Sequence, residues 1–240
     1  GVLTEGFDHI GTMITWYNHP YYKTHFEELG FQIEKEYLEN KFPFKNVIRE
    51  PIERVATVLK KRYELKSLNF TKTKDIFPYV DKMFDLFNKS YAALPSFVPI
   101  SDIEIAYFKK KYISFINPEY IKFVVDKDDN MVAFGITMPS FSEALQKAKG
   151  KLLPFGLFHL LKAKKSSKDV IFYLIGVHPT YQNKGIHSLI FLEYQISFEK
   201  RGIENCIRTP ELSSNKAIAA VWKNFDPVNH KKRCTYRKDI

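Results

Sequence analysis

Cysteine is scarce in this sequence. Cys206 and Cys234 are the two cysteines among its 240 residues. Two thiols cannot build the disulfide framework on which small secreted domains depend, and their spacing matches no metal-ligand pattern. We therefore expect a reducing compartment, a cytoplasmic location and no metal site.

Long apolar runs and several nucleotide and metal motifs are also missing. The chain contains no stretch of 18 apolar residues, which argues against a membrane-spanning helix, and no signal peptide is visible. The patterns GxGxxG, GxxxxGK[ST] and HExxH are absent. The sequence therefore does not indicate a dinucleotide fold, a P-loop enzyme or a zinc protease.

Acidic residues are outnumbered by basic ones. The chain has 27 Asp and Glu against 37 Lys and Arg, which gives a formal net charge of +10. The lysines can form an ordinary solvated surface, or they can attract a phosphorylated cofactor, nucleic acid or a membrane surface. Hydrophobic residues make up 45% of the chain, which is enough for a sizeable globular core.

Apolar periodicity divides the chain into a mixed α/β series. We predict strands over 11–18, 31–39, 63–70, 169–177, 203–209 and 231–240, and a hairpin over 120–138. Helices are predicted over 19–31, 51–63, 75–91, 101–112, 187–201 and 213–225. Ser101 is the expected N-cap of the helix over 101–112, and a serine is the expected N-cap of the helix over 213–225. Residues 140–168 are predicted to form two helices broken at Gly150 and Pro154. From about residue 60, this order predicts a mixed sheet flanked by helices.

The stretch VHPTYQNKGIHSLI (177–190) joins an apolar strand directly to an amphipathic helix. A helix N-terminus has unpaired backbone N–H groups and partial positive charge, and both favour binding of phosphate. Gly185 lets the backbone approach a diphosphate, Lys184 adds a cation, and Gln182 can hydrogen-bond within the loop. The stretch indicates an anion site, and the alternative is a strand–turn–helix connection without a ligand.

The pattern V-x-P-x-x-Q-x-x-G-I in this position resembles the acetyl-CoA signature of the GNAT acyltransferase superfamily. The resemblance implies a GNAT-like α/β fold with a mostly antiparallel central sheet, and acetyl-CoA or another acyl-CoA as cofactor. It implies that Ile175 and Val177 offer backbone groups to pantetheine, and that Asn215 in SSNKAIAAVW lies near the thiol end. It also implies that six successive residues hold the pyrophosphate: Gln182, Asn183, Lys184, Gly185, Ile186 and His187.

Two positions depart from the pattern of that superfamily. The second residue after the motif glycine is usually Gly or Ala, and here it is His187, which either narrows the loop, contacts phosphate or faces solvent. The superfamily's frequent general-acid tyrosine falls seven residues after the asparagine, and here that residue is Trp222. Because an indole does not protonate a thiolate, we expect Trp222 to be a core aromatic residue.

Residues 1–42 carry a second resemblance. HFEELGF (25–31) is similar to the helix end LYExLGF of the same superfamily, and EGFDHIGTMITWYNHPYY and KRCTYRKDI are similar to an uncharacterised bacterial family with tandem GNAT-like halves. This implies that residues 1–42 are the remnant of a first GNAT-like domain in an N-terminally shortened chain, or else an extension packed on the sheet. Residues 43–62 are then a linker helix, and residues 63–240 a GNAT-like domain with a helical insert over 139–168.

The acceptor side of the predicted site offers few chemical groups. Strand 169–177 has no glutamate, and Tyr173 shares a strand face with Ile175 and Val177 by period-two alternation. Tyr173 and Asn215 are the catalytic candidates, and a buried structural role is the alternative for Tyr173. His230, close in sequence to the last predicted strand, is a further polar group, and we expect it to be a histidine of a surface loop.

The apolar run LLPFGLFHLL in the insert lies between basic runs. Three interpretations are open: a lid or pocket wall for an acyl chain or apolar acceptor, a membrane-surface segment over 152–165, or a helix packed on the sheet or on a missing first half.

These features predict an acyl-CoA-dependent N-acyltransferase that acts on a small-molecule or peptide amine. One alternative is a non-catalytic CoA-binding or interaction module, which His187, Trp222 and the missing strand carboxylate favour. Another is a tandem-GNAT aminoacyltransferase that uses charged tRNA. The chain has no basic platform interleaved with aromatic residues, so we do not expect a nucleic-acid partner. The acceptor, the acyl group and the oligomeric state stay open.

Overall fold

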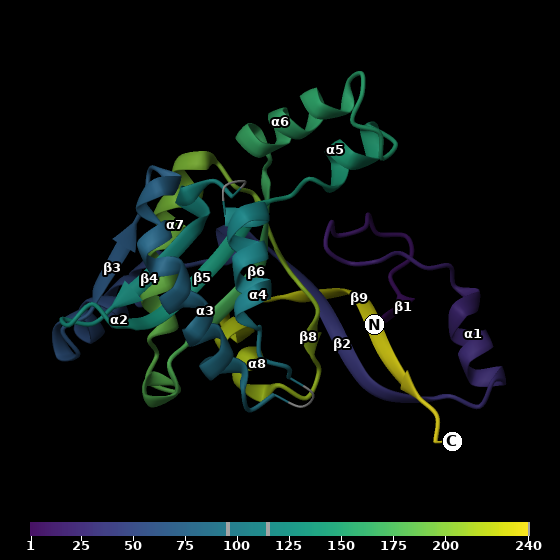
Figure 1. Ribbon diagram of the computed structural model, residues 1–240, viewed down its shortest axis with the longest axis horizontal. Coiled ribbons are helices and arrows are strands. Elements are labelled where there is room, and N and C mark those ends of the chain that lie inside the picture. Colours follow the sequence, from purple (N-terminus) through teal and green to yellow (C-terminus); the bar gives the residue numbers. More distant parts are fainter. Residues whose placement is uncertain (95–96, 114–115, 240) are drawn as a thin grey trace. The chain divides into compact units, whose positions relative to one another are not determined.

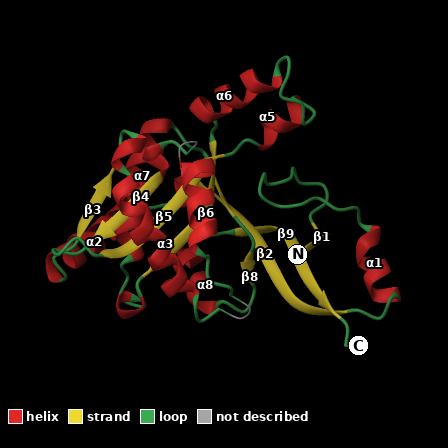
Figure 2. Cartoon of the chain, in the orientation of Figure 1, coloured by secondary structure: helices red, strands yellow, loops and turns green. Residues whose placement is uncertain are grey.

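The computed structural model describes residues 1–94, 97–113 and 116–239. The predicted fold class is confirmed: the chain is a mixed α/β protein with a mostly antiparallel sheet flanked by helices (Figure 2). It divides into two compact units. Unit 1 comprises Gly1–Val47, Pro139–Ile171 and Gly202–Ile240, and unit 2 comprises Ile48–Met138 and Phe172–Arg201. Residue 240, the expected end of the last predicted strand, lies outside the described residues.

The sheet of unit 1 joins both ends of the chain. Its strands are β1 (Val2–Glu5), β2 (Gln32–Pro43), β7 (Asn205–Arg208), β8 (Glu211–Leu212) and β9 (Val228–Arg237). Their order is β1–β9–β2–β7, antiparallel throughout, and β8 also pairs with β2. Figure 1 shows the purple β2 beside the yellow β9. Residues 1–42 therefore share a sheet with the C-terminal strands, and their origin in a first GNAT-like domain stays a prediction, as do the linker and insert boundaries.

The helices of unit 1 are α1 (Tyr21–Glu28), α5 (Ser142–Lys147), α6 (Gly156–Ser166) and α8 (Lys216–Trp222). The two predicted insert helices are confirmed as α5 and α6. The N-cap serine predicted for the helix over 213–225 is wrong. This helix is α8, which begins at Lys216, and its N-cap residue is Asn215. The side chain of Asn215 accepts a hydrogen bond from the backbone N–H of Ile218 at 3.2 Å, which satisfies one of the unpaired donors of the first turn.

The strand predicted over 11–18 is wrong. This segment is turn and loop, since both the backbone N–H and the hydroxyl of Thr15 donate to the carbonyl of Thr12 at 2.9 Å. A turn of this kind replaces the ladder bonds that a strand would need. The large apolar side chains of GTMITWYN are exposed and the polar Thr12 is buried, so the alternating pattern does not mark a buried strand face.

Unit 2 contains β3 (Lys66–Asn69), β4 (Ile121–Val125) and most of β5 (Met131–Pro139) and of β6 (Asp169–Val177), in the order β6–β5–β4–β3. Its helices are α2 (Arg49–Arg62), α3 (Phe77–Tyr91), α4 (Asp102–Phe108) and α7 (His187–Arg201). The predicted hairpin is confirmed as β4 and β5, and the predicted capping box of Ser101 and Glu104 is present at the start of α4.

Two helices of unit 2 lie on opposite faces of its sheet. The ring of Phe134 in β5 lies 6.5 Å from that of Phe87 in α3. A Cβ atom added to the next residue, Gly135, would lie 2.7 Å from Ile190 of α7. Because successive strand residues point to opposite faces, α3 and α7 sandwich the sheet. All residues of β4 and β5 are therefore buried, which explains their nearly continuous apolar sequence.

Candidate functional site

The connection from β6 to α7 is a turn with alternating backbone handedness. A 3-10 turn over Pro179–Tyr181 leads into it, and α7 begins at His187. Asn183 has φ 59° and Gly185 has φ 80°, whereas Lys184 between them does not have a positive φ. Alternation in the sign of φ along a turn is typical of anion-binding nests, in which successive N–H groups point toward a common centre.

The amides of this turn have unused donor capacity. Within the part of the chain that the structure describes, no residue accepts a hydrogen bond from the backbone N–H groups of residues 183–186. The following amides are satisfied, since Ser188 N–H donates to the Gly185 carbonyl at 2.9 Å and Leu189 N–H to the Ile186 carbonyl at 3.0 Å. The dipole of the 15-residue α7 adds positive potential at this end. The turn can therefore hold a phosphate or diphosphate group.

The structure gives a reason for glycine at position 185 that does not depend on a ligand. The close approach of the backbone to a ligand, predicted from the sequence, stays a prediction. A Cβ atom added there would lie 3.6 Å from Leu59 and 3.7 Å from Val55 of α2, which are ordinary contact distances. The requirement for glycine comes from φ 80°, a conformation in which L-residues are strained.

An aromatic pair positions the lysine of the turn. The Nζ atom of Lys184 lies 5.5 Å from the ring centroids of both Tyr63 and Tyr181, whose rings form an edge-to-face pair at 5.8 Å. Cation–π attraction holds the ammonium group beside the turn. As expected, Gln182 bonds within the loop, donating from Nε2 to the Val177 carbonyl at 3.2 Å. Tyr63 was not anticipated, because it lies far away in the sequence at the end of α2.

His187 is half-buried in the first turn of α7, with its ring 5.7 Å from that of Phe191. Burial lowers the pKa of His187 from its ordinary value of 6.5. The imidazole is therefore neutral at pH 7, and it does not provide a positive charge for a phosphate group.

The strand leading to the turn presents Tyr173, Ile175 and Val177 as partly exposed side chains of one face. The hydroxyl of Tyr91 in α3 donates to the carbonyl of Ile175 at 2.9 Å, so this carbonyl already has a partner inside unit 2. Burial raises the pKa of Tyr91 and of Tyr173 to about 12. Both phenols are protonated at neutral pH and can donate a proton, but they cannot act as bases.

Asn215 belongs to unit 1, and the predicted residues from Tyr173 to His187 belong to unit 2. The side-chain oxygen of Asn215 is occupied in capping α8. Trp222 at the end of α8 is buried, as expected, and its Nε1 donates to Glu211 at 3.1 Å. The expectation for His230 is wrong, because this residue of β9 is buried beside His9, with 5.5 Å between the ring centroids. A strand residue was mistaken for a loop residue because β9 begins earlier than predicted.

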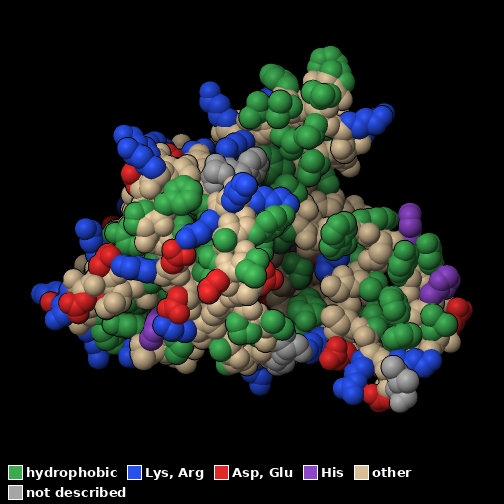
Figure 3. Space-filling model, viewed as in Figure 1, with side chains coloured by type: hydrophobic (Ala, Val, Ile, Leu, Met, Phe, Trp, Pro, Cys, Tyr) green, Lys and Arg blue, Asp and Glu red, His purple; other side chains and the backbone are tan. Residues whose placement is uncertain are grey.

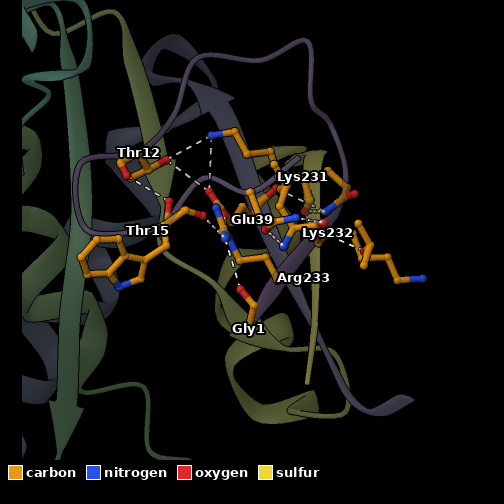
Figure 4. A network of polar contacts seen from close by, with 12 residues as sticks. Gly1, Thr12, Thr15, Glu39, Lys231, Lys232 and Arg233 are labelled. Atoms are coloured by element: carbon orange, nitrogen blue, oxygen red, sulfur yellow. Dashed lines mark hydrogen bonds and ion pairs between the residues drawn. The ribbon is translucent and has the colours of Figure 1, made fainter. Parts of the chain in front are cut away.

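A buried charge cluster in unit 1 was not anticipated (Figure 4). Glu39 of β2 is fully buried and accepts hydrogen bonds from Arg233, from Lys231 at 3.5 Å and from the Thr12 hydroxyl at 3.2 Å. Arg233 also donates to the Trp16 carbonyl at 2.7 Å. The cluster ties the loop after β1 to the paired strands β2 and β9. In the sequence, the spacing of Lys231 and Arg233 by two residues was a sign that both face one side of a strand.

The stability of unit 1 is expected to fall at mildly acidic pH because of His230. The pKa of His230 is lowered to about 4, chiefly by burial and also by the charges of Lys231, Lys41 and His9, while Glu39 acts in the opposite direction. Between about pH 6.5 and pH 4, the unfolded chain binds a proton at this site that the folded chain does not bind. The free energy of unfolding should therefore decrease as the pH falls through this window.

Urea unfolding at several pH values between 7 and about 4 measures this dependence. His230→Asn is expected to flatten it, and His25→Asn, at an exposed position in α1, is the matched control. The same pH dependence in the His230→Asn variant as in the original protein would contradict the assignment.

Comparison with known proteins identifies the fold. No family model matches the chain. The chain is 23% identical over 247 residues to Protein YghO of Escherichia coli, a match that covers 100% of this chain and 62% of that protein. The structure of a GCN5-related N-acetyltransferase from Sphaerobacter thermophilus matches 92% of this chain and 56% of its own, with a TM-score of 0.55 and 9% identity. A tandem GNAT protein from the clavulanic acid biosynthesis pathway matches 95% of this chain and 61% of its own, again with a TM-score of 0.55 and 9% identity.

The chain therefore has the fold of the GNAT N-acetyltransferases, as the sequence resemblance implied. It spans between 56% and 62% of the length of these three proteins. At such low sequence identity the likeness defines the fold, and the function must be argued from the site.

Proposed function

We propose that this protein is an acyl-CoA-dependent N-acyltransferase, with acetyl-CoA or another acyl-CoA as donor and a small-molecule or peptide amine as acceptor. The observation that carries the proposal is the nest of unpaired amides at residues 183–186, at the N-terminus of α7. The GNAT fold supports it, since the turn occupies the stretch whose sequence resembles the cofactor signature of that superfamily. A cytoplasmic location, where acyl-CoA is available, is part of the proposal.

In this proposal, different residues of unit 2 contact different parts of the cofactor. The amides of residues 183–186 bind the diphosphate of the cofactor, and Lys184, held between two tyrosines, neutralises part of its charge. The backbone of β6 at Val177 and at the N–H of Ile175 positions the pantetheine arm. Bound acyl-CoA would supply an activated thioester for attack by the amine. The Tyr173 hydroxyl, which is protonated at neutral pH, is the group proposed to protonate the leaving thiolate.

Thermal unfolding tests the cofactor proposal. At a CoA concentration of about 100 Kd, the native state gains about 2.7 kcal/mol, and a chain of this size should then melt about 5–10 °C higher. Pantetheine, which lacks the diphosphate, is the matched control and should produce a much smaller shift. If CoA leaves the melting temperature unchanged at millimolar concentration, the proposal is wrong.

The second candidate is a CoA-binding module without catalytic activity. One observation favours it: at the position of the superfamily's frequent acid, Trp222 is buried and its Nε1 is bonded to Glu211. Transfer of a labelled acetyl group to any member of an amine panel distinguishes the two candidates. CoA binding without transfer would favour the module.

A further inference from the structure

Residues 147–168, here called the insert tip, combine exposed apolar side chains with a uniform positive charge. The segment contains seven lysines and no Asp or Glu. Six of its large apolar side chains are between 50% and 76% exposed: Leu152, Leu153, Phe155, Leu157, Phe158 and Leu161. Figure 3 shows hydrophobic side chains gathered over α5 and α6, with Lys and Arg side chains at the margins of this patch.

The two kinds of side chain are ordered along α6. Leu157, Phe158 and Leu161 lie on one exposed strip of the helix, and the same strip continues as Lys162 and Lys165 one turn later. The apolar residues Leu152, Leu153 and Phe155 precede the helix. The tip thus presents an apolar end followed by a basic collar. Buried apolar area and electrostatic attraction to anionic lipid are the two contributions to binding at a membrane surface.

The exposure of these side chains argues against the interpretation that α6 is packed on the sheet of this chain. Clustered large apolar side chains on a surface usually mark a binding site for a protein or a membrane. An acyl-chain pocket would need the apolar side chains to face inward, whereas here they face solvent. The seven lysines of the tip would also contribute nothing to the binding of an apolar acyl chain.

We propose that the insert tip docks on an anionic membrane surface. The positive charge of the tip favours a membrane over a second copy of the chain. Lysines near phospholipid headgroups are attracted to anionic lipid, whereas the tip of a second copy would repel this one. The tip lies on the membrane and does not cross it, since α6 has 11 residues and no helix in the described ranges is long and apolar enough to span a bilayer. The proposal goes beyond acyl transfer and is independent of it.

Co-sedimentation with vesicles tests the proposal without CoA. The protein is expected to bind vesicles of phosphatidylcholine and phosphatidylglycerol at low salt, and to bind pure phosphatidylcholine vesicles much less. The double variant Phe155→Ser/Phe158→Ser should weaken the partition coefficient at least about tenfold, because the apolar contact is lost. Lys162→Glu/Lys165→Glu should weaken it by at least about tenfold as well, because each lysine near the surface contributes attraction.

Matched controls lie outside the tip. Ile103→Ser removes a side chain of α4 that is 84% exposed, and Lys66→Glu/Lys127→Glu reverses two exposed charges, and both variants should bind like the original protein. Unchanged thermal unfolding of the tip variants shows that they fold, and a retained shift with CoA separates this proposal from the proposed function. No binding to the anionic vesicles, or equal binding by the phenylalanine variant, overturns the proposal. The proposal is also overturned if the protein does not bind vesicles and the same phenylalanines instead support self-association or tighter binding of longer acyl-CoA.

Discussion

Gly185→Val is expected to weaken CoA binding by more than about 100-fold. A β-branched residue is a strong outlier at the φ of 80° found here, so the turn must rebuild. Rebuilding disperses the N–H groups of residues 183–186, and each hydrogen bond to a charged group contributes about 1.5–3 kcal/mol. Loss of two such bonds corresponds to at least a 100-fold change, since about 1.4 kcal/mol is a factor of ten. A Cβ atom at position 185 would make only ordinary contacts with Leu59 and Val55, so the expected damage comes from the backbone angle of this residue.

Calorimetric titration with CoA measures the effect. Asn183→Gly is the matched control, since its φ of 59° is equally open to glycine and the nest is preserved. We expect its affinity to stay within about threefold of that of the original protein. If Gly185→Val binds CoA as tightly as the control does, then the turn at residues 183–186 is not the diphosphate site.

Glu39→Ala is expected to lower the free energy of unfolding of unit 1 by about 3–5 kcal/mol. Glu39, Lys231 and Arg233 are all buried, and the carboxylate is the acceptor that both cations share. Its removal leaves two buried cations without a counter-ion and the Thr12 hydroxyl without its carboxylate acceptor. Attraction within the cluster is strong because water is excluded, and for the same reason a broken cluster is costly.

Urea unfolding followed by tryptophan fluorescence measures this loss, because Trp16 and Trp222 are the two tryptophans of the chain and both belong to unit 1. Glu27→Ala, also in unit 1, is the matched control. Its partner Lys23 is half-exposed, as is Glu27 itself, and such surface pairs contribute at most about 1 kcal/mol. A loss for Glu39→Ala no larger than that of the control would contradict the assigned role of the cluster.

Local chemistry explains which parts of the fold could be predicted. Strand β6 has the bounds expected from its apolar run, 169–177, and α7 has the bounds expected from its amphipathic pattern and its glycine stop. The Ser101 capping box and the turn between β4 and β5 also follow from neighbouring residues. In each case the deciding hydrogen bonds join residues a few positions apart, so the sequence alone specifies them.

Tertiary structure decided what depends on distant partners. Alternation in GTMITWYN predicted a strand, but a strand needs a neighbour, and this segment bonds to itself and to Glu39 and Arg233. The positions of Tyr63 and Tyr91 at the candidate site depend on the packing of α2 and α3, which no local pattern encodes.

The sequence by itself determined the order of the elements, the turn at residues 182–187 and its resemblance to a cofactor loop. Only the tertiary structure decided that Gly185 is required for its backbone angle, that Glu39 holds a buried cluster together and that the insert tip faces solvent. The physical reason is that periodicity gives the faces of a helix or strand, whereas burial depends on what packs against each face.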